Sequence, residues 1–401
     1  GDTFGVTYDV TDQNIVINDI DVRVSGAQDG AGNIMAADTN NDVFSVITAP
    51  APFVSAIVSA SGDGPFGVGD SVDITMTFDE NVDFTANGGS LDATLSNGET
   101  VTVANSDTGL GGVAFFTFTY TVGEGETDSA DLDVSSFSLQ GGATLVASDD
   151  GVPANLSIPV ANALADNADV VVDANTPSVA APDLTAATDT GVSNSDNLTN
   201  DATPTIAGTT EAGATVNVRV AGASVGTTTA DGSGVWSFTF TAGQLSAGAN
   251  TVDIIASDAV NTSADSADLA LTLDTTAPTA NADTSGTATE GDPAGNLGGL
   301  NVTANDTDTA GTAPVSAVAG SAANVGTAVT GDNGGLFTVN ADGTVSFAPN
   351  GDFDALAAGA TTTTTVAVTV RDQSGNTDTA DLTVTVTGIN DAPTATDPAD
   401  Q

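Results

Sequence analysis

Alternating apolar and polar positions recur along the whole chain. Apolar residues occupy every second position in runs such as 71–78, 214–220 and 381–387. A period of two places one face of an extended strand inward and the other in water. Short clusters of Gly, Asn, Asp and Ser separate these runs, and such clusters favour tight turns. The pattern therefore predicts half-buried antiparallel strands and an all-β fold class.

One segment breaks this strand pattern. Residues 352–358, Asp-Phe-Asp-Ala-Leu-Ala-Ala, are compatible with one or two turns of helix. We expect any such helix to lie at the edge of a sheet sandwich.

The aromatic residues follow the strand pattern. Phe116, Phe118 and Tyr120 alternate along one run, and Trp236, Phe238 and Phe240 alternate along another. Alternation on one strand places large side chains on a single face, which favours a core role over ligand binding.

Similar proline-containing segments divide the chain at 48–52, 173–177, 274–278 and 390–393. Each follows a strand-like run, and the intervals of 125, 101 and 115 residues between their prolines suit single β-sandwich domains. We predict an incomplete domain at 1–50, complete domains at 51–176, 177–277 and 278–392, and the start of another repeat or a linker at 393–401. The predicted architecture is a set of tandem β-sandwich domains in an elongated row.

The first 50 residues repeat the second half of the next domain at a constant offset, without a gap. The matching residues are Phe4, Thr7, Tyr8, Val10, Asp19, Asp21 and Val22 on one side and Phe116, Thr119, Tyr120, Val122, Asp131, Asp133 and Val134 on the other. Two interpretations remain open. The sequence could be a segment of a longer chain, which we favour, or a half domain could receive its missing strands from a neighbouring chain by strand addition.

The charge balance restricts the partners of this protein. The chain has 53 Asp and Glu against 3 Lys and Arg, a formal net charge of -50, and no His or Cys. Nucleic acids and anionic membranes require basic surfaces, so we expect neither as a partner. Hard metal cations remain, because calcium prefers carboxylate, amide and carbonyl oxygens. The 40% of hydrophobic residues, arranged in alternating runs, indicate a folded chain.

Catalytic chemistry has little support. Without His, Cys or Lys the chain lacks an imidazole base, a thiolate nucleophile and a Schiff-base amine. Asp107-Thr-Gly and Asp189-Thr-Gly resemble the paired loops of aspartic proteases, but they fall in dissimilar segments and suit ordinary turns. Paired acids could serve a glycosidase, yet one Trp and two Tyr provide few surfaces for sugars. We expect no enzymatic activity.

Membrane and export signals are also lacking in the sequence given. No apolar run approaches the length of a membrane span, and residues 1–20 do not resemble a signal peptide. We therefore expect no direct membrane insertion in this segment and any export signal outside it.

Three segments resemble known families. Residues 53–160, through 69–78 and 116–122, resemble the immunoglobulin-like (Ig-like) repeats of giant bacterial adhesins. Residues 189–201, 209–215 and 234–236 resemble the bacterial Ig-like repeats of RTX-type adhesins. Residues 305–308, 339–345 and 386–393 are similar to VCBS or cadherin-like repeats. By the first resemblance, residues 1–50 correspond to the C-terminal half of an Ig-like repeat.

These resemblances imply an extracellular protein of the bacterial cell surface that folds on meeting calcium. The expected function is that of a structural extender holding another domain away from the surface, with neighbouring repeats of the same chain as partners. Two alternatives remain open. Identical chains could assemble into a surface layer, sheath or extracellular filament, or the repeats could form a glycan- or protein-binding adhesin module.

Calcium ligands are expected where carboxylate and amide side chains meet at strand ends and domain junctions. The candidates are Asp173, Asn175, Asp189, Asp196, Asp201, Asp274, Asp306, Asp308, Asp372, Asn390 and Asp391. Their spacing does not match an EF-hand loop. For each residue taken alone, capping of a turn is the favoured role.

Overall fold

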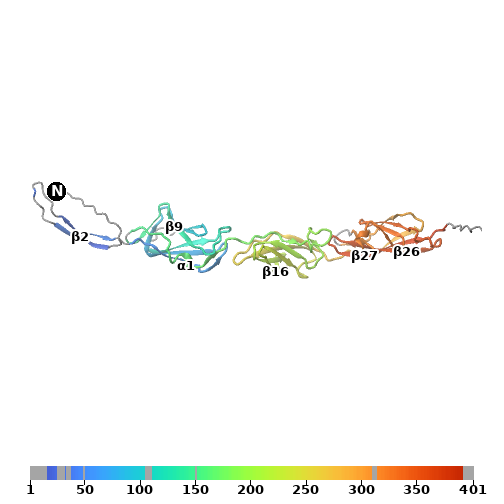
Figure 1. Ribbon diagram of the computed structural model, residues 1–401, viewed down its shortest axis with the longest axis horizontal. Coiled ribbons are helices and arrows are strands. Elements are labelled where there is room, and N and C mark those ends of the chain that lie inside the picture. The colour runs from blue at the N-terminus through green and yellow to red at the C-terminus, as the bar shows by residue number, and fades with distance from the viewer. Residues whose placement is uncertain are drawn as a thin grey trace, which may run out of the picture. The chain divides into compact units, whose positions relative to one another are not determined.

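The computed structural model describes residues 16–24, 32, 38–47, 50–103, 111–149, 151–308 and 314–391. Strands form nearly all of its regular structure, as Figure 1 shows. The chain divides into two compact units. Unit 1 comprises Gly1–Thr176 with Ala259–Asn261, and unit 2 comprises Pro177–Asp258 with Thr262–Gln401. The predicted all-β fold class is confirmed.

The described part of residues 1–50 is mainly one antiparallel pair in unit 1. It consists of β1 (Val16–Val24) and β2 (Asp38–Ile47), with Val16 opposite Ile47. Residues 4–10, which carried the first part of the predicted correspondence, lie outside the described residues, as do residues 393–401, whereas residues 19–22 lie in β1.

The rest of unit 1 places two sheets around one core. In the first sheet β5 pairs with β3, β8 and β10, and in the second β6 pairs with β7 and β9. Two further strands, β4 and β11, form a separate parallel pair. The elements are β3 (Val54–Ser59), β4 (Gly64–Phe66), β5 (Ser71–Thr85), β6 (Ser90–Leu95), β7 (Thr100–Thr102), β8 (Val113–Thr121), β9 (Val134–Gln140), β10 (Thr144–Ala147), α1 (Leu164–Asn167) and β11 (Val170–Val172). Ile74, Phe118 and Leu91 are fully buried in the shared core, which draws on both sheets.

The first part of unit 2 also has two sheets. One has the order β12-β14-β17 and the other the order β13-β19-β18-β15-β16. The strands are β12 (Asp183–Leu184), β13 (Leu198–Thr199), β14 (Thr205–Thr209), β15 (Thr215–Val220), β16 (Ala223–Thr229), β17 (Val235–Thr239), β18 (Gly248–Ser257) and β19 (Leu269–Leu273). Trp236, Ile206 and Val218 are buried in its core.

The second part of unit 2 has two four-stranded sheets, β20-β27-β26-β22 and β21-β25-β24-β23. The elements are β20 (Asp283–Thr289), β21 (Gly295–Asn301), β22 (Val315–Val318), the 3₁₀ turn η2 (Ala322–Asn324), β23 (Ala328–Thr330), β24 (Leu336–Val339), β25 (Thr344–Ala348), β26 (Thr361–Arg371) and β27 (Thr377–Thr387). Phe337 and Phe347 from one sheet meet Val368 and Val384 from the other in a single core.

The predicted helix at 352–358 is wrong. The segment forms consecutive turns, in which Asp352 N donates to Pro349 O at 3.2 Å and Leu356 N to Phe353 O at 2.9 Å. The Asp352 carboxylate accepts a hydrogen bond from Gly335 N at 2.7 Å. This bond holds the segment against another loop, so its side chains serve tertiary contacts instead of a helix. The short helix α1 lies elsewhere, at a place where the strand pattern gave no helical signal.

Candidate functional site

Asp189 lies in the loop after β12 and is only 4% exposed. Its Oδ2 accepts a hydrogen bond from Asn197 N at 3.2 Å, whereas Oδ1 has no partner among the described residues. Burial raises the pKa of Asp189, and the charge of Asp196 acts in the same direction, against the lowering effect of the Asn197 amide. A buried carboxylate oxygen without a donor is suited to a cation.

Asp196 and Asp201 flank the same short strand, β13, but their side chains cap turns. Asp196 Oδ1 accepts from Leu198 N at 3.3 Å. Asp201 Oδ1 accepts from Thr203 N at 2.8 Å. Both bonds are of the kind that the turn-capping interpretation predicts.

Asp274 and Asp372, far apart in sequence, are brought together in unit 2. Asp274 follows β19, and its Oδ2 accepts from Ser374 Oγ at 3.2 Å. Asp372 is fully buried at the end of β26, and its Oδ1 accepts from Gly375 N and Asn376 N at 2.7 and 2.8 Å. The Asp372 carboxylate therefore already has protein donors, and its first role is to fix its own turn.

Asp173 and Asn175 lie in unit 1 after β11. Asp173 Oδ1 accepts from Asn175 N at 3.3 Å, and Asn175 Nδ2 donates to Asp128 Oδ1 at 2.8 Å. Their backbone oxygens accept from the carboxamide of Asn261, at 3.1 and 3.2 Å respectively. An amide group, which sequence reasoning missed, thus binds both carbonyls.

Asp306 lies near a further acidic residue that the sequence did not reveal, Asp283 at the start of β20, and Asp308 follows Asp306 by two residues. Asp306 Oδ1 accepts from Asn281 N at 2.7 Å. Asp283 is buried, and this burial together with the charge of Asp306 raises the pKa of Asp283 to about 6. Asp283 has no turn signature, so only the tertiary approach of the Asp306 segment identifies it.

Asn390 and Asp391 follow β27 and are exposed, with Asn390 Nδ2 donating to Asp391 O at 3.3 Å. Beside them lies Glu290, also missed by sequence reasoning. Glu290 is 4% exposed, and its Oε1 accepts from Ile389 N at 2.8 Å. Its Oε2 has no partner among the described residues. Glu290 and Asp189 therefore share the property of one unpartnered buried oxygen.

The predicted ligands are spread over both units. Across the ranges that the structure describes, no group of three or more acidic residues could hold a metal ion. A calcium ion at Asp189 or Asp283 would need carbonyl, amide and water oxygens to complete its coordination.

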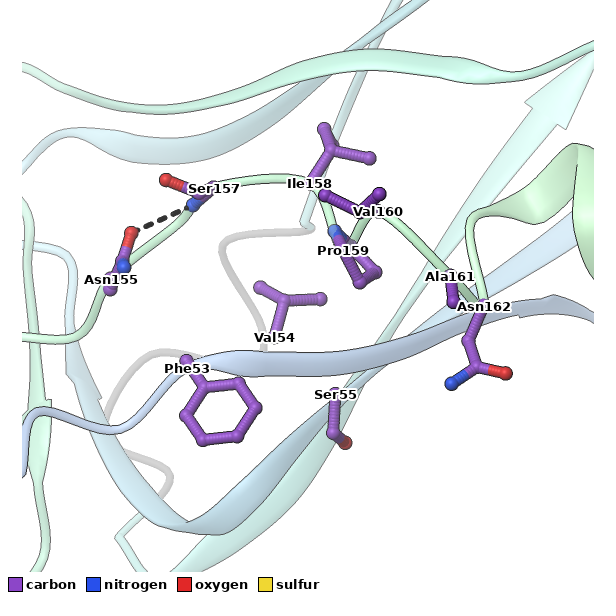
Figure 2. Close-up of a pocket in the computed structure, with 10 residues that line it drawn as sticks. All are labelled: Phe53, Val54, Ser55, Asn155, Ser157, Ile158, Pro159, Val160, Ala161 and Asn162. Atoms are coloured by element: carbon purple, nitrogen blue, oxygen red, sulfur yellow. Dashed lines mark hydrogen bonds between the residues drawn. The ribbon is translucent and has the colours of Figure 1, made fainter.

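An open groove in unit 1 has a different character. It lies between the start of β3 and the segment 155–162, and its ten lining residues carry no charge: Phe53, Val54, Ser55, Asn155, Ser157, Ile158, Pro159, Val160, Ala161 and Asn162. In Figure 2 Val54 points toward Pro159 and Val160, whereas Phe53 and Ser55 point to the other side of the strand. Asn155 Oδ1 accepts from Ser157 N at 3.0 Å, and Val160 is fully exposed.

The groove follows one edge of β3. Among the described residues, the segment pairs with this edge only at its ends, through Asn155 N to Pro52 O at 2.7 Å and Ile57 N to Asn162 O at 2.9 Å. Between these two bonds the segment leaves the edge, which opens the groove.

Two family models match this chain. A bacterial Ig-like domain matches residues 175–275, and a bacterial Ig domain matches residues 275–385. The chain therefore contains two tandem bacterial Ig-like domains, called here the second and third domains. No curated protein matches. Within the described residues no helix has the length and apolar character needed to cross a membrane.

Solved structures also align with the chain. A segment of a 1.5-MDa bacterial ice-binding adhesin aligns at 16% identity, covering 83% of this chain and 96% of that one, with a TM-score of 0.37. The BSP domain of a biofilm associated protein aligns at 15% identity over 86% and 67% of the two chains, with a TM-score of 0.20. Protocadherin gammaB7 EC3-6 aligns at 12% identity over 83% and 74%, with a TM-score of 0.25. At these scores the alignments carry no argument, and the assignment rests on the two family models.

Proposed function

We propose that this chain is a structural extender segment of a large extracellular protein of the bacterial cell surface. The observation that carries the proposal is the succession of two bacterial Ig-like domains, each with a complete core of its own. Such domains need no partner to bury their apolar faces, so they can be repeated to set a distance. The domain boundaries 51–176, 177–277 and 278–392 are part of this proposal, as is the VCBS or cadherin-like character of the last one.

The acidic surface suits this role. A net charge of -50 keeps neighbouring chains soluble and apart through mutual repulsion. The same charge destabilises the folded state, because like charges are held close together. A bound cation would offset this repulsion.

Calcium is the cation that we propose. Calcium prefers carboxylate, amide and carbonyl oxygens, which are hard ligands. Asp189, with one buried oxygen lacking a donor, and Asp283, whose burial beside Asp306 disfavours its charged form, are the residues that fit a cation best. Calcium bound there would neutralise the carboxylates and stiffen the loops that carry them.

Force spectroscopy on the single chain tests the extender function. A sandwich of about 100 residues releases roughly 35 nm of chain when it unfolds. We expect discrete unfolding events with this spacing, at higher force in calcium than in chelator. Gradual extension at low force in calcium would contradict the proposal.

The uncharged groove favours a second candidate function, a self-assembling subunit. An incompletely paired strand edge beside exposed apolar residues can accept a strand from an identical chain. Sedimentation of the purified chain in calcium separates the two candidates. A monomer at all concentrations supports the extender, whereas concentration-dependent ordered arrays that Val160→Asp abolishes would support assembly.

A further inference from the structure

The turn between β26 and β27, residues 372–376, is held by hydrogen bonds among its own residues. Asp372 is fully buried and accepts hydrogen bonds from Gly375 N, Asn376 N and, through Oδ2, Asn376 Nδ2 at 2.8 Å. A carboxylate that accepts three donors holds a turn in one conformation. We call residues 372–376 the hairpin tip.

The hairpin tip of the third domain contacts the second domain through its backbone. Val192 N donates to Gln373 O at 3.1 Å, and Thr190 Oγ1 donates to Ser374 O at 3.1 Å. Ser374 is fully buried, and its Oγ donates to Asp274 Oδ2 at 3.2 Å. These bonds join two domains with separate cores inside unit 2.

Asn376 extends the contact to the segment that connects the two domains. Its carboxamide donates to Asp274 O at 2.8 Å and to Thr276 O at 3.3 Å. Two carbonyls that are two residues apart are therefore held by one side chain. Alanine at position 376 would leave both without this donor.

Two glycines permit this close approach. Gly191 has φ of +107°, and a Cβ there would collide with Gln373 O. Gly375 has φ of +101°, and its Cβ would lie 3.0 Å from Gly191 N. The two backbones thus meet directly, with no side chain between them.

A similar arrangement occurs in unit 1. The carboxamide of Asn261 donates to Asp173 O and Asn175 O, again two residues apart, and its Oδ1 accepts from Val68 N at 2.8 Å. Asn261 and Asn376 both follow an Asp by a few residues, at 258 and 372. The same pattern of an Asn carboxamide and two backbone carbonyls thus occurs twice, which indicates a specific contact and not a chance one.

We propose that the hairpin tip is an interaction surface whose partner is the end of the preceding Ig-like domain, and that it stabilises that domain. The recognition elements are the Asn376 carboxamide, the Ser374 side chain and the tip carbonyls. In an extender, this contact would make the two domains resist force together, and this part of the inference rests on the proposed function. The coupling itself can exist in a chain with any function.

The single tryptophan gives a direct test on the full chain. Trp236 is buried in the second domain, so its fluorescence reports the unfolding of that domain. The substitution Asn376→Ala lies in the third domain. We nevertheless expect it to lower the midpoint temperature of thermal unfolding, followed by Trp236 fluorescence, by about 4 °C or more. Hydrogen exchange at the Val192 amide, which donates to the tip, should accelerate in the same variant.

Asn333→Ala is the matched control. Asn333 also donates its carboxamide to one backbone carbonyl of the third domain, Thr363 O at 2.9 Å, but lies outside the tip. We expect no change in the Trp236 transition or in Val192 exchange. An unchanged transition in Asn376→Ala, or an equal shift in Asn333→Ala, would overturn the proposal.

A second pair covers the case in which Asn376→Ala fails to fold. Gly191→Ala and Gly248→Ala both place a side chain at positive φ in the second domain, but only the Gly191 Cβ meets the tip. We expect Gly191→Ala to accelerate exchange at amides of 373–376 and Gly248→Ala to leave them unchanged. Equal exchange at the tip in both variants would also overturn the proposal. Neither result depends on the force measurement that tests the extender function.

Discussion

Buried carboxylates in this chain differ in their hydrogen-bond partners, and this difference decides what each can do. Asp372 accepts three protein donors, whereas Asp189 and Glu290 each keep one oxygen without a partner among the described residues. A fully satisfied carboxylate stabilises its turn. An unsatisfied one destabilises the fold until a proton or a cation joins it.

Asp283 provides the clearest pH dependence. Burial and the charge of Asp306 raise its pKa to about 6, so the folded state prefers the protonated form. The stabilisation is complete below the unfolded pKa of about 3.9 and is lost as pH rises through 6. Asp283→Asn should therefore raise the unfolding free energy at pH 7 by about 1 kcal/mol after allowance for screening, and calorimetry in chelator between pH 4 and 7 measures it.

Asp342→Asn is the control of opposite sign. Hydrogen bonds from the Thr344 hydroxyl and amide lower the pKa of Asp342, so this residue contributes stability above its unfolded pKa and loses it as pH falls. We expect Asp342→Asn to destabilise the third domain at pH 7. An identical pH slope in the wild type and in Asp283→Asn would contradict the assignment of Asp283.

Gly208 illustrates a packing constraint on one residue. A Cβ at this position would lie 2.7 Å from Trp236 Cζ2, and Trp236 is buried. Overpacking of this kind costs about 1–3 kcal/mol. Gly208→Ala should lower the midpoint of unfolding followed by Trp236 fluorescence. Gly232→Ala in the same domain should not, because a Cβ there meets nothing within 4 Å.

Sequence reasoning found some of these residues and missed others for a physical reason. Asp189 stands in a polar stretch between strand signals, so its location in a loop could be predicted. Asn376 and Asn261 act by donating to backbone carbonyls, which carry no side-chain signature. Their role depends on which distant segment folds against them, and a single sequence does not encode this as a pattern.

Strands are the elements that the alternation predicted best. The runs at 71–78, 214–220 and 381–387 lie in or overlap β5, β15 and β27. Period-two burial is visible along each of them, because one face meets a core and the other meets water. The helix predicted at 352–358 was wrong, because the contacts of this segment with Gly335 and the core outweigh a weak local helical preference.

Strand β8 allows a test of this alternation with two adjacent residues. Phe116 is buried, with edge-on contacts to Phe78 and Phe84 at centroid distances of 6.2 and 5.8 Å, whereas Phe115 is 58% exposed. Phe116→Ala should cost about 3–5 kcal/mol of unfolding free energy. Phe115→Ala should cost far less in chemical denaturation, and equal losses would contradict the assigned faces.

At the scale of the whole molecule, the net charge was accessible from the sequence, whereas the contacts inside unit 2 were not. Composition gives the net charge of -50 directly. This charge predicts that any salt stabilises the fold by screening repulsion. A specific calcium effect must therefore be separated from screening.

Calcium at matched ionic strength makes that separation. A site at 100 times its dissociation constant adds about 2.7 kcal/mol, and extracellular modules bind calcium at roughly 10⁻⁴ to 10⁻³ M. We expect calcium to raise the Trp236 midpoint beyond the effect of sodium chloride, and Asp189→Asn to remove this excess while raising the midpoint in chelator. Asp231→Asn, which loses a turn-capping carboxylate that accepts from Ser233 N at 2.8 Å, should keep the calcium response. Of the two effects, only ion binding depends on the Asp189 carboxylate, whereas screening does not. Equal unfolding midpoints in calcium and in sodium chloride would therefore show that screening alone stabilises the second domain.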